Sequence, residues 1–248
     1  MRELASAHPC VRFFSLSLHI LLPRRCALCG TLVHDVAWFP APLCEACESG
    51  LKAIDGRRCA SCGRPLISEA QLCMECRETT RADLRIMPVF MYRGAVAVMM
   101  HHYKTRERRS LATYFAFKLA PLIQSVCADT GTNPCEVAIV PVPPRPEKLR
   151  SGKCDLVAAL ATALGVWGYQ SVHVLARRSN SVQQKTLARN DRFKNASQAY
   201  YLASVGAVPK RVILLDDVVT TGATLRACAE ILKQAGAEVV AAAVIAAD

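Results

Sequence analysis

The segment Arg211–Thr224 constrains the fold of this chain more than any other stretch. Residues 211–215 are aliphatic and partly β-branched, which is typical of a short buried strand. Two adjacent carboxylates, Asp216 and Asp217, follow at the carboxyl end of this predicted strand. A small, hydroxyl-rich loop comes next, and a helical pattern then covers Leu225–Gln234. We therefore expect a strand, an acidic pair, a loop and a helix N-terminus to meet at one place.

The loop after the acidic pair has the composition of a phosphate site. Backbone N–H groups at a helix start suit a phosphate, particularly beside threonine hydroxyls, and Gly222 allows a close approach of the backbone. The two carboxylates can accept hydrogen bonds from ribose hydroxyls or face a bound Mg²⁺. An ordinary strand-to-helix connection capped by threonine would explain one threonine, but not two aspartates at a buried strand end. The segment therefore predicts a site for a phosphorylated sugar.

This segment also resembles the phosphoribosyl pyrophosphate (PRPP) signature of type I phosphoribosyltransferases. The resemblance implies that Asp216 and Asp217 contact the ribose hydroxyls as the catalytic pair, and that PRPP arrives with Mg²⁺. It further implies that the loop holds the 5′-phosphate. The implied PRPP-binding residues there are Val218, Thr220, Thr221, Gly222, Ala223 and Thr224.

Cysteines form the second strong pattern. Eight of the 13 cysteines occur as four CxxC pairs, in two units that each begin CxxCG and end LCxxC. Two CxxC turns complete a Cys₄ site, the usual structural zinc site, and an all-thiolate site leaves no open position for catalysis. Strict CxxC pairing and an odd cysteine total favour metal in a reducing cytoplasm over secreted disulfides. The predicted zinc ligands are Cys26, Cys29, Cys44, Cys47, Cys59, Cys62, Cys73 and Cys76.

The internal repeat favours two sequential zinc sites, one per unit, although a cross-braced pairing of the two units stays open. About 50 residues here have little core of their own, so metal binding should supply much of their folding free energy. We predict an N-terminal helix over 1–24, a double zinc ribbon over 25–80 and a third domain over 86–248. No segment reaches the roughly 18 apolar residues of a membrane span.

The remaining chain alternates predicted strands and helices, which implies a parallel sheet with helices on both faces. Strands are expected at 86–92, 137–142, 172–175 and 238–246, and helices at 111–126 and 153–164. Lys104, in a basic segment, is a candidate for contact with a phosphate, and a solvated charge run is an equal alternative. The strand at 137–142 ends in a stiff Pro-Pro-Arg-Pro loop. The resemblance to phosphoribosyltransferases implies that this loop receives the pyrophosphate of PRPP, with Arg145 as the candidate contact beside Lys148 and Arg150.

A basic segment, residues 177–194, carries six Lys or Arg side chains against one acidic residue, Asp191. It suits a hood over an active site or a track for a nucleic-acid backbone, with a plain solvated loop as the alternative. The net charge of +11 resides mostly after residue 85, which suits anionic partners. The nucleic-acid-binding candidates in this segment are Arg177, Arg178, Lys185, Arg189 and Arg192.

Taken in order, the zinc ribbons, the Ile-Val-Pro-Val-Pro strand end, the basic Gln-containing segment and the PRPP signature resemble ComF/GntX-type proteins. The segment from Ser181 through Asn195 is similar to that family's Thr-x-x-Gln-x-x-Leu…Arg…Asn pattern. One departure is residues 150–156, Arg-Ser-Gly-Lys-Cys-Asp-Leu, where the family usually has an Arg-Gly-Phe-Asn-Gln-like segment. If that segment contacts the acceptor, this chain uses another acceptor or none.

The resemblance implies a cytoplasmic α/β protein, with a parallel-sheet phosphoribosyltransferase-like domain after a small double zinc ribbon. The expected activity is transfer of phosphoribosyl to an acceptor with release of pyrophosphate, linked to DNA uptake in natural competence. One alternative is a non-catalytic protein that binds single-stranded DNA or senses PRPP, although few aromatic residues in the basic segments are available for base stacking. Another is a PRPP-responsive regulator with a protein partner, such as a competence or DNA-processing protein, on the zinc ribbons, which an exposed apolar patch near residues 38–40 would favour.

Overall fold

The computed structural model describes residues 25–33, 43–78, 84–105, 110–179, 198–203 and 208–248. The described chain forms two compact units that divide between Leu51 and Lys52, inside the predicted double ribbon. The predicted helix over 1–24, the apolar patch at 38–40 and most of the basic segment lie outside the described residues. The three domain boundaries proposed from the sequence stay predictions.

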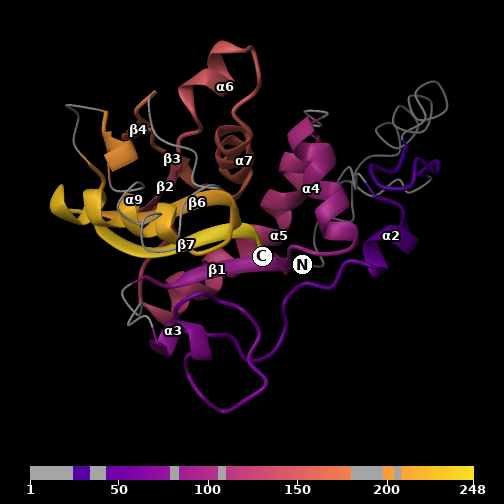
Figure 1. The fold of residues 1–248 in the computed structure, drawn as a ribbon, viewed down its shortest axis with the longest axis horizontal. Coiled ribbons are helices and arrows are strands. Elements are labelled where there is room, and N and C mark those ends of the chain that lie inside the picture. Colours follow the sequence, from indigo (N-terminus) through magenta and orange to yellow (C-terminus); the bar gives the residue numbers. More distant parts are fainter. Residues whose placement is uncertain (1–24, 34–42, 79–83, 106–109, 180–197, 204–207) are drawn as a thin grey trace, which may run out of the picture. The chain divides into compact units, whose positions relative to one another are not determined.

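A five-stranded parallel sheet forms the centre of the larger unit, in the order β1-β7-β6-β2-β3 (Figure 1). The predicted α/β class and parallel sheet are confirmed. The strands of this sheet are β1 (Ile86–Met91), β2 (Val137–Pro141), β3 (Gln170–Ser171), β6 (Arg211–Val219) and β7 (Glu238–Ala247). A second, antiparallel pair consists of β4 (Leu175–Arg177) and β5 (Tyr200–Leu202).

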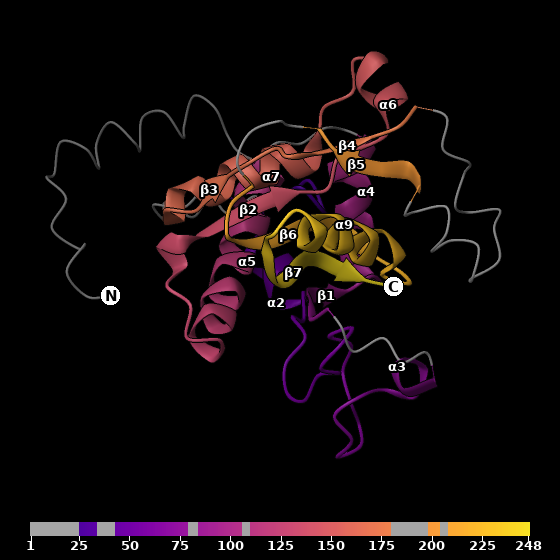
Figure 2. The same ribbon diagram turned by 90° about the vertical axis from the view of Figure 1, so that its left-hand side faces the viewer.

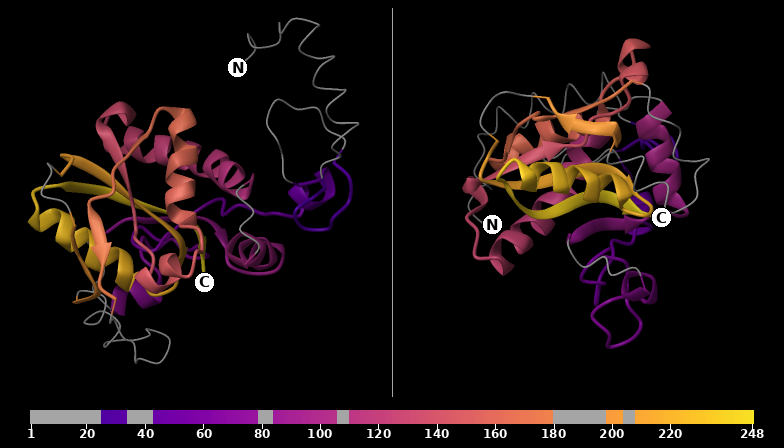
Figure 3. Two further views of the ribbon diagram at one scale, coloured as in Figure 1. Left: turned by 90° about the horizontal axis from the view of Figure 1, so that it is seen from above. Right: turned by 60° about the vertical axis from the view of Figure 1, so that its left-hand side comes forward.

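Two helices pack on one face of the sheet and a third on the other (Figures 1 and 3). The first face carries α5 (Ser110–Asp129) and α7 (Leu156–Leu164), which pack against each other and against the strands. The opposite face carries α9 (Ala223–Gln234), and β5 lies against the same helix. The α5 helix is long and apolar enough to cross a membrane, but more than half of its most apolar window is buried within the protein.

Further helices lie outside this group of three (Figure 2). They are α2 (Glu45–Ser49), α3 (Met74–Glu78), α4 (Ala95–Thr105), α6 (Pro146–Arg150) and the 3₁₀ turns η1 (Pro134–Glu136) and η2 (Gly165–Trp167).

Strand β6 differs from the prediction in its length. It was expected to end at Leu215, but it continues to Val219 and therefore contains the acidic pair. The reason is its partner β7, because Asp216 pairs with Val244 and Val218 with Ala246 in parallel register. This pairing supplies backbone hydrogen bonds beyond the apolar run.

Two further boundaries were wrong. Of the strand expected at 172–175 only Leu175 is in a strand, because residues 172–174 connect β3, which pairs with β2, to β4, which begins at Leu175 and pairs with β5. The helix expected from Lys153 begins at Leu156, because the Asp155 carboxylate caps it by accepting from the backbone N–H groups of Val157 and Ala158 at 3.1 and 3.0 Å. A side chain that accepts these otherwise unpaired amides fixes the first turn of a helix.

Candidate functional site

The carboxyl end of β6 and the start of α9 enclose a cavity of about 430 Å³. This volume lies within the range typical of small-molecule sites. Asp216 lines the cavity, as does the loop predicted to hold a phosphate. The complete lining is Asp216, Val218, Val219, Thr220, Thr221, Gly222, Ala223, Thr224, Leu225 and Asp248.

Local geometry at the loop follows from its sequence. Gly222 adopts a left-handed conformation, with φ of 72°, and caps α9. A Cβ at this position would lie 2.8 Å from Ile86 Cδ1, so glycine is required by the backbone angle and by a close neighbour. The Ala223 N–H points to Thr221 Oγ1 at 3.4 Å, which brings a hydroxyl to the helix start. The first amides of a helix lack intrahelical partners and suit an anion.

The members of the acidic pair point to opposite faces of the sheet, because successive side chains of a strand alternate. Val212 and Leu214 belong to the apolar cluster that packs against α9, and Asp216 continues their series. Asp217 continues the other series, and its Oδ2 forms an ion pair with Lys104 Nζ of α4 at 2.9 Å. The sequence did not predict this separation.

Asp216 lies in surroundings that oppose its ionisation. Burial and the neighbouring Asp217 charge raise its pKa to about 8, although the Asp217 N–H, Lys104 and Arg177 act in the opposite direction. These surroundings therefore favour the protonated form of the Asp216 carboxyl in the ligand-free protein. A neutral carboxyl can donate a hydrogen bond, and it does not repel an incoming phosphate.

The predicted cations occupy different positions. Lys104 is the partner of Asp217, whereas Arg145 is the N-cap of α6, in the loop that follows β2. β2 and β6 are parallel neighbours, with Pro141 opposite Leu215. The loop that carries Arg145 therefore begins at the carboxyl ends of the strands, where the acidic pair also lies. Arg177 and Arg178 lie on or beside β4, and Lys185, Arg189 and Arg192 lie outside the described residues.

Each arginine at the end of β4 stacks on a tyrosine of β5. The Arg177 guanidinium carbon is 5.2 Å from the Tyr200 ring centroid, and that of Arg178 is 5.0 Å from the Tyr201 ring centroid. Both distances are within the range of cation–π contacts. Tyr200 is buried, and Tyr201 is exposed at the surface. The sequence indicated the arginines but not the tyrosines, because the pairs form across two strands.

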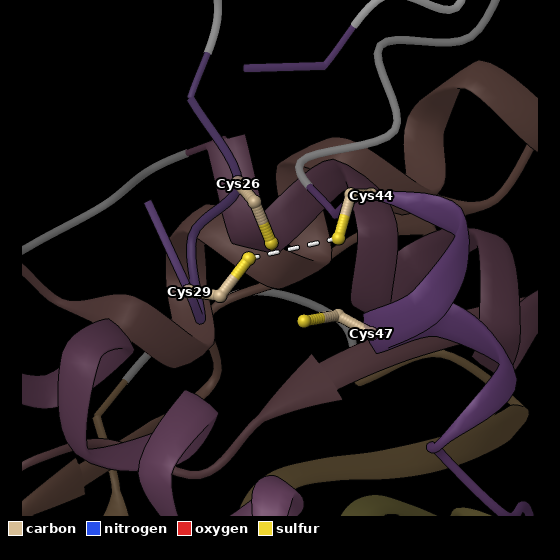
Figure 4. A group of neighbouring side chains, drawn as sticks. All are labelled: Cys26, Cys29, Cys44 and Cys47. Carbon is tan, nitrogen blue, oxygen red and sulfur yellow. Dashed lines mark hydrogen bonds between the residues drawn. The ribbon is translucent and has the colours of Figure 1, made fainter. Parts of the chain in front are cut away.

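Each predicted zinc site is assembled from one cysteine unit, in the sequential arrangement. In the smaller unit, Cys26, Cys29, Cys44 and Cys47 converge, and the Sγ atoms of Cys29 and Cys44 are 3.6 Å apart (Figure 4). Tetrahedral zinc with bonds of about 2.3 Å would separate its sulfur ligands by about 3.8 Å, so the four thiols fit the ion. Hydrogen bonds with Thr31 lower the pKa of Cys29 to about 6, whereas burial and the neighbouring thiols raise the pKa of Cys47 to about 12, so the thiols of this cluster ionise unequally before a metal binds.

The second cysteine cluster lies in the larger unit, together with the sheet. It consists of Cys59, Cys62, Cys73 and Cys76, with 3.7 Å between the Sγ atoms of Cys62 and Cys73. Burial opposes ionisation of Cys59, but backbone hydrogen bonds with Cys62 and Cys73 outweigh it and lower the pKa of Cys59 to about 6. This cluster also fits a tetrahedral metal. All four positions are taken by sulfur, which indicates a structural role.

Comparison with known proteins matches two segments of the chain to two domain families. Residues 17–77 match the double zinc ribbon domain, and residues 170–248 match the phosphoribosyl transferase domain.

Full-length relatives carry names from DNA uptake and use. The chain is 23% identical over 225 residues to competence protein ComFC of Streptococcus pneumoniae, covering 86% of this chain and 96% of that protein. It is 27% identical over 225 residues to competence protein ComFC of Bacillus subtilis, covering 85% and 89%. It is 25% identical over 226 residues to DNA utilization protein YhgH of Escherichia coli strain K12, covering 89% and 96%.

Proposed function

Because this chain belongs to the ComF-type family, with a double zinc ribbon before a phosphoribosyltransferase domain, we propose that it binds PRPP with Mg²⁺ and transfers its phosphoribosyl group. The cavity beside the loop at 220–224 is the observation that supports this proposal most directly. The 5′-phosphate would occupy the start of α9, with the ribose hydroxyls toward the acidic pair. The pyrophosphate would meet Lys104 and Arg145.

In the proposed reaction the bond from ribose C1 to pyrophosphate breaks and a bond from C1 to the acceptor forms. The acceptor proton passes to solvent and pyrophosphate leaves as the anion. The transition state is expected to be oxocarbenium-like, as in glycoside chemistry. Positioning and charge would then carry the catalysis, with Lys104 and Arg145 stabilising the leaving group. Mg²⁺, bound with PRPP, would neutralise pyrophosphate oxygens, and carboxylate oxygens such as those of Asp216 and Asp217 are ligands that it accepts.

The proposal is tested by calorimetric titration of PRPP and Mg²⁺ into the zinc-loaded protein. A double variant, Asp216→Ala with Asp217→Ala, is the control. We expect binding by the native chain and none by the variant. No binding by the native chain would reject the proposal. Release of pyrophosphate in the presence of candidate acceptors would then separate turnover from binding alone.

A second candidate function, binding of single-stranded DNA, is favoured by the Arg–Tyr stacks on β4 and β5. The Tyr201 ring offers a stacking surface beside a cation, as single-strand-binding proteins do. The names of the relatives, for competence and DNA utilization, support a role in DNA uptake or processing. We propose that this role is cytoplasmic, with proteins of that process as partners. Anisotropy of a labelled oligothymidylate should then fall steeply with salt, and Tyr201→Ala should weaken binding at every salt concentration. A salt-independent signal would contradict this function.

A further inference from the structure

The second zinc site lies against the outer edge of the central sheet, in the same compact unit. β1 is the edge strand, and the ribbon segment covers its free side. The Ile54 N–H donates to the Val89 carbonyl, and the Ile86 N–H donates to the Ser61 carbonyl, both at 2.7 Å. Ser61 is one of the two residues between Cys59 and Cys62. This CxxC turn is the first knuckle of the zinc site, and the turn Cys73–Cys76 is the second. The first knuckle therefore pairs directly with Ile86, the first residue of β1.

Ile86 connects this knuckle with the loop that we propose to hold the 5′-phosphate. A Cβ on Gly63, the residue after Cys62, would clash with the Pro88 ring and with the carbonyl oxygen of Ile86. The side chain of the same Ile86 lies against Gly222, where a Cβ would be 2.8 Å from Cδ1. Ile86 and Gly222 are both buried. The knuckle and the loop therefore pack against opposite ends of one residue.

Two arginines add polar links between the same two elements. Arg64 donates from Nη1 to Glu75 Oε2 at 2.9 Å and from Nη2 to the Thr220 carbonyl at 3.2 Å. Glu75 lies between Cys73 and Cys76, in the second knuckle of the same site. In the opposite direction, the buried Arg226 of α9 donates from Nη2 to Ser61 Oγ at 2.9 Å. Each knuckle of the second zinc site thus supplies one hydrogen-bond acceptor to the link between the zinc site and the loop. Glu75 accepts from Arg64, and Ser61 accepts from Arg226.

From these contacts we infer that the second zinc site positions the phosphate loop, with Arg64, Ile86 and Arg226 as positioning residues. The inference rests on the proposed PRPP site for its functional meaning, but the coupling concerns the loop itself. Zinc fixes the two knuckles relative to each other, and the knuckles hold the carbonyl of Thr220 and the first turn of α9. A loop fixed before the ligand arrives loses less conformational freedom on binding. Loss of zinc from this site should therefore loosen the loop and weaken binding of PRPP.

Arg64→Met breaks the link through Arg64, and Glu75→Gln weakens it by removing the charge of the acceptor; neither variant changes a cysteine. The matched control is Arg58→Met, because Arg58 also bonds the ribbon to β1, at the carbonyls of Pro88 and Ile54, but has no bond to the loop among its described contacts. We expect all three proteins to retain their zinc by metal analysis. Amide hydrogen exchange at residues 219–226 should rise in Arg64→Met and Glu75→Gln and stay at the native rate in Arg58→Met.

Affinity for PRPP with Mg²⁺ should fall by about tenfold in Arg64→Met, because the loop loses a hydrogen bond from a charged group. It should fall by less than about twofold in Arg58→Met, because Arg58 forms no described bond to the loop. Arg64→Lys should recover little, because an ammonium cannot bridge the Glu75 carboxylate and the Thr220 carbonyl as a guanidinium fork does. Unchanged exchange at 219–226 in both link variants would overturn the inference. A native chain that fails to bind PRPP would reject the proposed function instead, and the exchange comparison would still decide the coupling.

Discussion

At the scale of single residues, the acidic pair combines two different electrostatic environments within one strand. Asp217 has the Lys104 ammonium 2.9 Å away, whereas the half-buried Asp216 lies beside Asp217 and has a pKa raised to about 8. The Asp216 carboxyl can therefore donate a hydrogen bond into the cavity that it lines, whereas Asp217 lies on the other face of the sheet beside Lys104.

Replacing Asp216 should change how stability depends on pH. Its folded pKa lies above the ordinary value of about 4, so the folded chain holds a proton that the unfolded chain releases. The free energy of unfolding should therefore fall as pH rises from about 4 to 8, by at most about 1.4 kcal/mol per pH unit. Asp216→Asn, which mimics the protonated form, should remove this contribution. Urea unfolding of both zinc-loaded proteins between pH 6 and 8 measures it, and parallel pH profiles would contradict the shift.

Replacing Lys104 should affect the ligand more than the fold. The ion pair with Asp217 is partly exposed, so Lys104→Gln should change the free energy of unfolding by less than about 1 kcal/mol. If Lys104 meets the pyrophosphate, affinity for PRPP should fall by about tenfold or more, as expected for a lost charge-assisted contact. Lys233→Gln, the same charge change in the last turn of α9, is the control for calorimetry. Equal affinities of the two variants would remove Lys104 from the proposed site.

At the scale of elements, β6 and α9 act together because the turn between them is tightly packed. The strand is paired on both sides, with β2 and β7, and the helix buries Leu225, Cys228 and Leu232 against the sheet. The loop between them is therefore held at both ends. Within this loop, a substitution at Gly222 should reduce the stability of the protein most.

Gly222→Ala should destabilise the protein by about 2 kcal/mol or more, because alanine is strained at positive φ and its Cβ would press on Ile86. Gly236→Ala is a matched control, since Gly236 also has positive φ, at 88°, but faces open space. The control should cost about 1 kcal/mol, the strain alone. Urea unfolding gives both values. If the free energy of unfolding fell equally in the two variants, the Ile86 contact would not contribute to the effect of Gly222→Ala.

At the scale of the whole molecule, the two cysteine clusters belong to different compact units. The first lies within residues 1–51 and the second within residues 52–248, beside the sheet. The double ribbon is therefore continuous in sequence but divided in the fold. Each metal is expected to stabilise its own unit.

Metal analysis should find two zinc ions per chain. Cys29→Ser should reduce the count to one, because the four ligands of the other site all come from residues 59–76. The cooperative unfolding of the larger unit should persist in this variant, and calorimetric scanning would detect it. Cys62→Ser is the reciprocal change and should lower the unfolding temperature of the larger unit. Loss of both ions from either variant would show that the two sites are not independent.

The sequence alone determined the features that depend on near neighbours along the chain. A CxxC turn brings two sulfur atoms together by its own geometry, and the strand-loop-helix pattern around Gly222 depends on adjacent residues. Hence the zinc sites, the parallel α/β class and the position of the candidate loop could be predicted. The residues 34–42 and 180–197, which carry other predictions, lie outside the described chain.

Only the tertiary structure decided the contacts between distant residues. β6 extends past Leu215 because β7 pairs with it. Asp217 contacts Lys104 because the tertiary fold brings the end of α4 to the end of β6. Arg64 bonds to a carbonyl 156 residues away, at Thr220, and this link has no local signature. Periodicity records which side of an element is buried, but not which partner buries it. The partner is set by how strands and helices pack, and that packing joins the second zinc site to the proposed phosphate loop.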